Sequence, residues 1–503
     1  MDTKLSIMYP NPTPKIRSRA LAHRPNQGLR PNAASPHAGS RAAPESLSGG
    51  LADLCLRAID TGDRTHAATL LLDWLGCALA ATGQSQHRAL VRWARDAPQS
   101  GRSTAFGLGQ SSAEQAAFVN GGLGNILEMD DLHRASILHA GDVILPAALA
   151  QAQAADVTGT ALLDAIVSGY DVALRLGRAA AVGGYSAWYN SAVCGVFGAA
   201  MACARLRGAS RDQMLDALGQ AGMQAAGVWQ CRLEQTDSKQ VATAQAARAG
   251  VTSAALALAG LRGARHILDG PLGIFATYYP DADQGRVLSD PDGPWLLHEV
   301  SLKPWPACRH THAAIHLALG LRDRIDPAKV TRIEIGTYAA GVSFCTDPAP
   351  DTDHRARFSF EHCVAVALER GAPGLADFGA AARDDAEIRR LRGLTTVQES
   401  PALSAAFPGA MGARLSVRQT GAAALMRSTR HAPGDPELPL GLDAVQAKFR
   451  TNTGHAGLRT AAAGALINSV SDLPGAASLA ALNTALAGLG PDVEQTEKGP
   501  CHA

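Results

Sequence analysis

The stretch from Asn120 to Ala150 reads NGGLGNILEMDDLHRASILHAGDVILPAALA. Around its start, apolar or small residues recur every four positions. One series is Phe118, Gly122 and Ile126, and the other is Val119, Leu123 and Leu127. This spacing predicts a buried helix that delivers the acidic run at its end. Pro146 suits the first turn of a second helix, because the N–H that proline lacks has no helical partner there. We therefore expect a polar loop held between two helices.

That loop concentrates acidic and histidine side chains, which are Glu128, Asp130, Asp131, His133 and His139. An acid beside a histidine can fix the histidine's tautomer and raise its basicity, as removal of a proton from carbon requires. A polar loop between helices is more often simply solvated. The pattern by itself leaves both interpretations open.

The composition excludes several classes of function. The chain has 503 residues, with 46 basic and 45 acidic residues and a formal charge of +1, so no general charge favours nucleic acid or an anionic membrane. Hydrophobic residues make up 46% and aromatic residues only 5%, which is typical of closely packed, alanine-rich helices. The longest apolar run, Gly250 to Leu261, has the length of a core helix, so we predict no membrane span.

The nine cysteines are scattered, odd in number and without a C-x-x-C pair. This pattern favours reduced thiols and a cytoplasmic location. It also argues against an iron–sulfur hydro-lyase, whose cluster needs grouped thiolates.

Changes in hydrophobic spacing and composition along the chain predict a mainly α protein with a large all-helical domain and a smaller α+β lid domain. Residues 1–45 are basic and proline-rich and predict a disordered extension. Residues 46–300 predict the first part of the helical domain, with helices over 51–59, 66–82, 87–97, 160–180, 192–208, 211–228 and 243–263.

Strand-like alternation over 330–338, 394–399 and 414–419, with a helix over 358–370, predicts the α+β lid at 301–440. Residues 441–485 predict a return to the helical domain, with Asp443 as an N-cap. Residues 486–503 predict a loose tail.

Several motifs resemble those of the MmgE/PrpD family, which includes 2-methylcitrate dehydratases, cis-aconitate decarboxylases and an iminodisuccinate epimerase. The family's acid-x-Asp-Asp run and the His-Pro-Gly-like turn after it match Glu128-Met-Asp-Asp131 and His139-Ala-Gly141. The resemblance continues along most of the chain from about residue 46. It makes His139 the expected base, oriented by Asp130 or Asp131, with His133 as a second titratable group.

Three further segments match family positions. Tyr189 stands before Gly195–Gly198, where the family commonly has a histidine; tyrosine can donate a hydrogen bond but is a poor base near neutrality. Lys239 precedes a predicted helix, so its charge and the helix terminus can meet one anion. Lys303-Pro-Trp-Pro-Ala-Cys-Arg-His310 joins the two predicted domains, where Lys303 and Arg309 can bind carboxylates and Cys308 and His310 lie beside them.

The fourth segment, Arg357-Phe-Ser-Phe-Glu-His362, matches the family's (Arg/Lys)-Phe-Ser motif, with His362 where a tyrosine is common. The segment predicts either that His362 faces a ligand cleft or that the segment is the start of a core helix in the small domain. His312 and His316 lie four apart on a predicted helix, but there is no H-E-x-x-H motif and no obvious third ligand, so we expect no metal.

Together, the residues and the resemblance predict a cofactor-independent lyase, either a dehydratase or a decarboxylase. Its substrate is expected to be a small di- or tricarboxylate such as 2-methylcitrate or cis-aconitate. Lys239, Lys303, Arg309 and Glu128 would hold the substrate while His139 moves a proton, and Tyr189 or His133 would protonate a leaving hydroxyl. The resemblance also implies a homodimer.

Two alternatives stay open at this point. An epimerase would use the same base and cations and return the proton to the opposite face. A non-catalytic carboxylate-binding or scaffold protein is the other alternative, and Leu132, where the family often has threonine, together with Tyr189 and His362, keeps it open.

Overall fold

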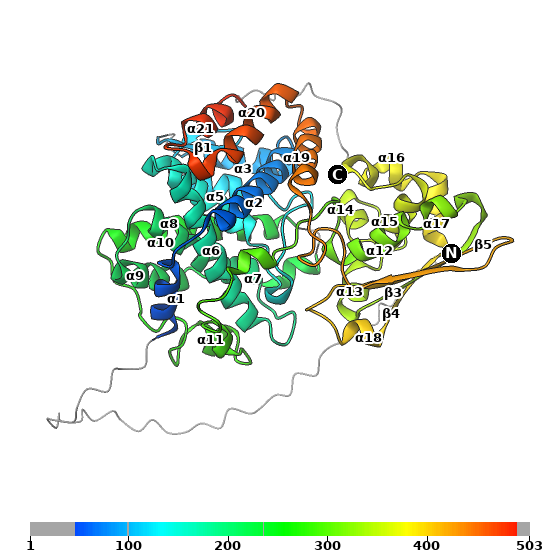
Figure 1. Ribbon diagram of the computed structural model, residues 1–503, viewed down its shortest axis with the longest axis horizontal. Helices are drawn as coiled ribbons and strands as arrows, with labels where there is room; N and C mark the ends of the chain where they lie inside the picture. Colours follow the sequence, from blue (N-terminus) through cyan, green and yellow to red (C-terminus); the bar gives the residue numbers. More distant parts are fainter. Residues whose placement is uncertain (1–45, 98–99, 235, 490–503) are drawn as a thin grey trace, which may run out of the picture. The chain divides into compact units, whose positions relative to one another are not determined.

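The computed structural model describes residues 46–97, 100–234 and 236–489, all of which fall in one compact unit. The predicted extension at 1–45 lies outside the described residues, as does most of the predicted tail. Residues 486 and 487, predicted as tail, are the last two of a helix. The mainly α fold class is confirmed (Figure 1).

The helical part, which we define as residues 46–300 and 441–489, carries most of the helices. In chain order they are α1 (Leu47–Cys55), α2 (Thr61–Ala80), α3 (Ser85–Arg95), α4 (Ala113–Gly121), α5 (Gly141–Ala155), α6 (Gly159–Ala180), α7 (Asn190–Val193), α8 (Gly195–Leu206), α9 (Arg211–Gly222), α10 (Ser238–Leu258), α11 (Ile274–Tyr278), α19 (Leu442–His455), α20 (Thr460–Ser471) and α21 (Ala480–Ala487). A two-stranded antiparallel ribbon, β1 (Ser103–Ala105) and β2 (Gly109–Ser111), precedes α4.

Helix α5 lies at the centre of this part, in contact with α4, α6, α8 and α10. Every residue from Gly141 to Gln153 is buried, so α5 has no solvent-facing stripe. Small residues allow the surrounding axes to approach closely. A Cβ on Gly198 of α8 would lie 2.3 Å from the backbone oxygen of Gly169 in α6, so this contact requires glycine.

The α+β part, residues 301–440, has its own hydrophobic core. Its sheet has the order β4-β3-β5-β6, made of β3 (Val330–Thr337), β4 (Thr395–Glu399), β5 (Ala413–Gln419) and β6 (Leu425–Thr429). Strand β3 pairs parallel with β4 and antiparallel with β5, which in turn pairs antiparallel with β6. Its helices are α12 (His312–Leu319), α13 (Ala339–Cys345), α14 (Asp353–Arg357), α15 (Phe360–Glu369), α16 (Ala380–Arg383), α17 (Ala386–Gly393) and α18 (Pro401–Ser404). Of these, α12, α13 and α15 contact the sheet.

After the α+β part the chain returns to the helical core. Helix α19 lies against α2 (Figure 1), and its Phe449 is buried at Gly76 of that helix. Lys448 of α19 forms a buried ion pair with Asp73 at 2.7 Å and donates a hydrogen bond to the backbone oxygen of Met129 at 2.8 Å. The return helix therefore supports the acidic run from behind.

The predicted N-cap of α19 is wrong: the N-cap is Gly441, and Asp443 lies in the first turn. A carboxylate there still interacts favourably with the positive end of the helix dipole. The predicted motion of the α+β part as a lid stays a prediction.

The central stretch differs from the prediction in three ways. Helix α4 ends at Gly121, so turns and not a helix carry the acidic run. Helix α5 begins at Gly141, which places Pro146 in its second turn, and the Gly141 N–H donates to the Asp131 carboxylate 3.0 Å away. The loop is also not solvated: from Asn120 to Ala150 only Ala135 is exposed and only His139 is half-buried.

No helix in the described part of the chain is long and apolar enough to cross a membrane. The eight cysteines among the described residues are free thiols, and Cys501 lies outside them.

Candidate active site

A cavity of about 750 Å³ opens between the helical part and the α+β part. The central stretch contributes Glu128 and His139, and helix α10 contributes Lys239. The segment that joins the two parts contributes Lys303, Cys308, Arg309 and His310. The structure thus brings seven of the predicted site residues, from distant points of the sequence, to the wall of one cavity.

His139 is held in one orientation. Its Nδ1 lies 2.5 Å from Oδ2 of Asp130 and 2.8 Å from the backbone oxygen of Asp131. Since a backbone oxygen only accepts hydrogen bonds, Nδ1 carries a proton, and Nε2 of the neutral ring is the nitrogen that can take up another. The side chain is 16% exposed and lines the cavity. This arrangement is suited to proton transfer at Nε2.

Asp130 also binds a lysine. Its Oδ1 lies 3.1 Å from Nζ of Lys303. Burial alone would raise the pKa of Asp130, but Lys303 and His139 hold it well below its usual value. Asp130 is therefore an anion that lies beside the His139 ring.

Asp131 has a different role from the one predicted, because its backbone and not its carboxylate contacts the His139 ring. Its carboxylate accepts hydrogen bonds from Gly141 N and, at 2.8 Å, from the Tyr170 hydroxyl. Burial raises the pKa of Asp131 to about 6. The side chain fixes the start of α5 and thereby the turn that carries His139.

A further buried acid, Asp142, lies behind this pair. Asp142 is fully buried, and its Oδ2 accepts a hydrogen bond from the Asn125 amide at 2.8 Å. Burial and the neighbouring charges of Asp130 and Asp131 hold the pKa of Asp142 well above its usual value. We therefore expect Asp142 to be neutral, and a neutral carboxyl can donate a hydrogen bond to the anion of Asp130.

Glu128 joins the two lysines. Its Oε1 lies 2.5 Å from Nζ of Lys239, and its Oε2 lies 3.6 Å from Nζ of Lys303. Burial raises the pKa of Glu128, but the two lysines outweigh that effect and lower it; in turn Glu128 and Asp130 raise the pKa of Lys239. The backbone at Glu128 has φ of +54°, a left-handed conformation that is unfavourable for glutamate. The lysines thus lie at the cavity wall as charged groups in a fixed arrangement.

The wall formed by the joining segment is equally constrained. Arg309 forms an ion pair with the buried Asp435, so its charge is already matched. The His310 ring contacts the hydroxyl groups of Tyr338 and, at 3.1 Å, Tyr185. Burial lowers the pKa of His310 to about 3, which keeps the ring neutral.

Five predicted site residues do not line the cavity: Asp130 and Asp131, which support His139 from behind, and His133, Tyr189 and His362. His133 is buried, with Nδ1 2.8 Å from the Ser136 hydroxyl and Nε2 3.1 Å from Glu299. Tyr189 is buried and stacks on Trp229. Nε2 of His362, in α15, donates to the backbone oxygen of Asp377 at 2.7 Å. All three side chains are buried and their contacts are with the protein; their predicted contacts with substrate stay predictions.

Three arginines of the cavity wall were not selected from the sequence: Arg232, Arg355 and Arg357. The Arg232 guanidinium lies over the Phe344 ring, 3.4 Å from its centroid. Arg357 was visible as the first residue of the Arg-Phe-Ser motif, but a sequence does not show whether a nearby acid matches a charge. Arg232 lies in a segment without a recognisable motif.

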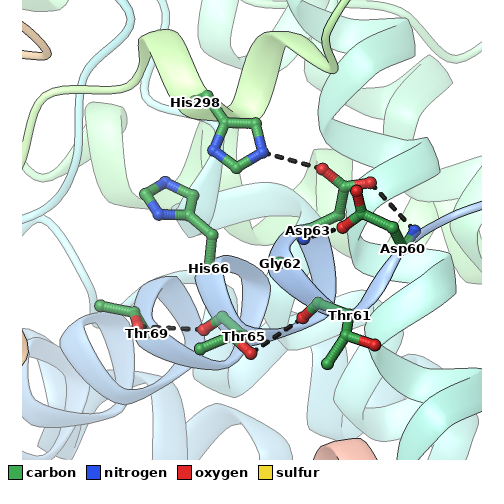
Figure 2. Close-up of a pocket in the computed structure, with 8 residues that line it drawn as sticks. All are labelled: Asp60, Thr61, Gly62, Asp63, Thr65, His66, Thr69 and His298. Carbon is green, nitrogen blue, oxygen red and sulfur yellow. Dashed lines mark hydrogen bonds and ion pairs between the residues drawn. The ribbon is translucent and has the colours of Figure 1, made fainter.

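A second hollow, of about 560 Å³, lies at the start of α2 (Figure 2). Its polar groups bind one another: Asp60 and Asp63 form the capping box of α2, and Asp63 lies 2.9 Å from His298. Nε2 of His66 lies 3.2 Å from the Leu297 backbone oxygen. These contacts provide partners for the polar groups and support the start of α2. We therefore assign the chemistry to the larger cavity.

One group of side chains has the spacing of metal ligands. Among the described residues, His431, Asp435 and Glu437 form the one group of three or more side chains close enough to share an ion. Arg134 binds both acids, and Arg309 binds Asp435 as well. Two arginines already balance these carboxylates, so the cluster is an ion-pair network between the two parts of the chain.

Comparison with known proteins agrees with this arrangement. The MmgE/PrpD N-terminal domain model matches residues 45–286, and the MmgE/PrpD C-terminal domain model matches residues 305–472. The chain belongs to the MmgE/PrpD family.

Three relatives show how far the similarity extends. A cis-aconitate decarboxylase-like protein, oryM, of Aspergillus oryzae is 32% identical over 228 residues, which cover 42% of this chain and 46% of that protein. The cis-aconitate decarboxylase of Mus musculus is 25% identical over 431 residues, covering 81% and 86%. That of Homo sapiens is 26% identical over 353 residues, covering 67% and 72%.

Proposed function

We propose that the protein is a lyase that decarboxylates a small unsaturated tricarboxylate such as cis-aconitate by proton transfer at carbon. The observation that carries the proposal is His139, whose Nδ1 is held by Asp130 and by the Asp131 backbone while its ring lines a cavity with two lysines. The names of the relatives support decarboxylation as the reaction.

In the proposed reaction, the bond between carbon and one carboxylate breaks, carbon dioxide leaves, and the electron pair stays on the substrate. The negative charge that develops is stabilised by Lys239 and Lys303, which are already fixed by Glu128. Protonated His139 then delivers the proton from Nε2 to the carbon. Asp130, as an anion, stays beside Nδ1 of His139 and holds the ring in place during this step.

Decarboxylation is favoured over dehydration by the positions of the other titratable groups. Dehydration needs a second group to protonate the leaving hydroxyl, and the two candidates for that role, His133 and Tyr189, do not line the cavity. Decarboxylation needs one proton-transfer group, which His139 provides.

The test is incubation of the purified protein with a panel of di- and tricarboxylates that includes cis-aconitate and 2-methylcitrate, followed by mass spectrometry. We expect cis-aconitate to lose carbon dioxide and 2-methylcitrate to stay unchanged. Loss of water from 2-methylcitrate would replace the proposal with a dehydratase. A change of configuration without loss of mass would replace it with an epimerase.

A further inference from the structure

We propose that Arg357 binds the third carboxylate of the substrate, beyond the two beside the lysines, and so selects tricarboxylates over dicarboxylates. This inference rests on the proposed function, because it assigns a binding role within the same cavity. It concerns a residue outside the histidine and lysine set that would carry the chemistry.

The first observation is that Arg357 is a buried cation without a counter-ion. Its exposed fraction is 8%, and its guanidinium makes no hydrogen bond or ion pair with any residue that the structure describes. Nε is completely enclosed, and the centroid of the Phe378 ring lies 5.7 Å from Cζ. A buried charge left without a partner is costly, so it calls for a ligand.

The second observation is the contrast with two other arginines of the same wall, Arg309 and Arg355. Arg309 is paired with Asp435. Arg355, two residues from Arg357, is paired with Asp347 at 2.7 Å and with Asp351 at 3.1 Å. The wall therefore offers a natural comparison between matched guanidinium groups and the unmatched group of Arg357.

The third observation is the position of Arg357 beside the proposed chemistry. Its backbone oxygen accepts a hydrogen bond from Cys308 N at 2.9 Å, which ties it to the segment that carries Lys303. Burial lowers the pKa of Arg357, whereas the charges of Asp353 and Glu128 raise it, so Arg357 and the acid that holds both lysines are electrostatic neighbours. A substrate beside Lys239 and Lys303 can present a further carboxylate to Arg357.

The guanidinium is suited to this role. It offers two parallel N–H donors to one carboxylate, whereas each lysine of the site already shares Glu128. Arg357 is the last residue of α14, which Thr352 caps, and α15 begins three residues later. Helices on both sides hold its backbone in place before a substrate binds.

The experiment compares cis-aconitate with methylmaleate, an analogue that lacks the third carboxylate. Binding of both acids to the full chain is measured by calorimetry for the native protein, Arg357→Gln and Arg355→Gln. We expect Arg357→Gln to weaken binding of cis-aconitate roughly 10- to 100-fold and to leave binding of methylmaleate nearly unchanged. Arg355→Gln, which removes the same charge from a matched pair, is expected to bind both acids as the native protein does.

Melting temperature separates this role from a structural one. Because Arg357→Gln removes an unmatched buried charge, its melting temperature is expected to equal or exceed that of the native protein, and Arg357→Lys is expected to restore only part of the affinity. Native-like affinity of Arg357→Gln for cis-aconitate would overturn the inference and leave the proposed function standing. A native protein that neither binds nor converts cis-aconitate would overturn both.

Discussion

Glu128 shows how single residues organise the site. It adopts a left-handed backbone conformation and binds Lys239 and Lys303 with its two carboxylate oxygens. The unfavourable backbone is offset by two buried ion pairs, so the conformation is held by the lysines that would bind the substrate. The acid–lysine cluster therefore acts as a unit, and the loss of one member changes the others.

Lys239→Met tests this unit. We expect binding and turnover to weaken together, with kcat/KM reduced roughly 10- to 100-fold, because the cation contacts both the substrate and the charge that develops. Raising the pH is not expected to restore activity. Lys329→Met is the control, since Lys329 is exposed and paired with Asp326. Near-native kcat/KM of Lys239→Met would remove Lys239 from the site.

Asp142 allows a second test at the residue scale. Because Asp142 is expected to be neutral and to donate to Asp130, Asp142→Asn preserves both its charge and a donor. Its turnover is expected to stay within a few-fold of native, whereas Asp142→Leu leaves Asp130 without that donor and is expected to lose about tenfold. Equal losses in the two variants, measured in steady-state assays, would mean that Asp142 acts as an anion.

At the scale of elements, the sequence predicted the type of most helices and strands and located their boundaries less well. Strand β3 alternates in sequence and was predicted, whereas β6 is an exposed edge strand with almost no alternation and was not. Helix α4 was predicted too long. Leu123, Ile126 and Leu127 have helical spacing, but they are buried in turns that follow the helix. Such boundaries depend on which distant segments bury a residue. The spacing of residues along one segment does not show these contacts.

The candidate site was predictable to the same degree. Motif positions located the residues that line the cavity, including His139 and Lys239. They did not give the direction of the side chains, so His133, Tyr189 and His362 were assigned to the cavity although tertiary packing turns them inward. They also could not show the missing counter-ion of Arg357, because that depends on which acids the fold brings near.

His362 in α15 provides a test of its structural role. Burial lowers the pKa of His362 to about 4, so the unfolded chain binds more protons than the folded chain between about pH 4 and 6.5. The contribution of His362 to the free energy of unfolding is full above pH 6.5 and falls by about 2 kcal/mol as the pH drops to 5. His362→Gln is expected to lose this part of the pH dependence and to keep native kcat.

Urea unfolding at pH 5 and pH 8, together with steady-state kinetics, measures both properties. An unchanged pH dependence of the free energy of unfolding, or a lower kcat with native-like stability, would contradict the structural role of His362.

At the scale of the whole molecule, the site depends on chain segments far apart in sequence. Lys448 of α19 supports the acidic run through the Met129 backbone and Asp73. Ser301, at the start of the α+β part, pairs with Leu132 in a short β-bridge and donates to Asp435. These contacts explain why the loop around His139 is buried although its sequence is polar.

Deletion of residues 1–45 tests where the folding unit begins. The family match starts at residue 45, and Ser46 caps α1 through a hydrogen bond to Gly49 N. We expect the truncated chain to keep its melting temperature to within a few degrees and to keep its kcat. A large drop in melting temperature would show that the first 45 residues contribute to the fold.

The most direct test of the central claim, that His139 moves a proton at a substrate carbon, is turnover of cis-aconitate in deuterium oxide, followed by NMR. The native protein is expected to release carbon dioxide and to place one solvent deuteron on the product carbon. His139→Gln, which keeps a polar side chain of similar size, is expected to slow this reaction roughly 100-fold or more while binding of the acid changes little. Near-native turnover and deuterium incorporation by a folded His139→Gln variant would contradict the account.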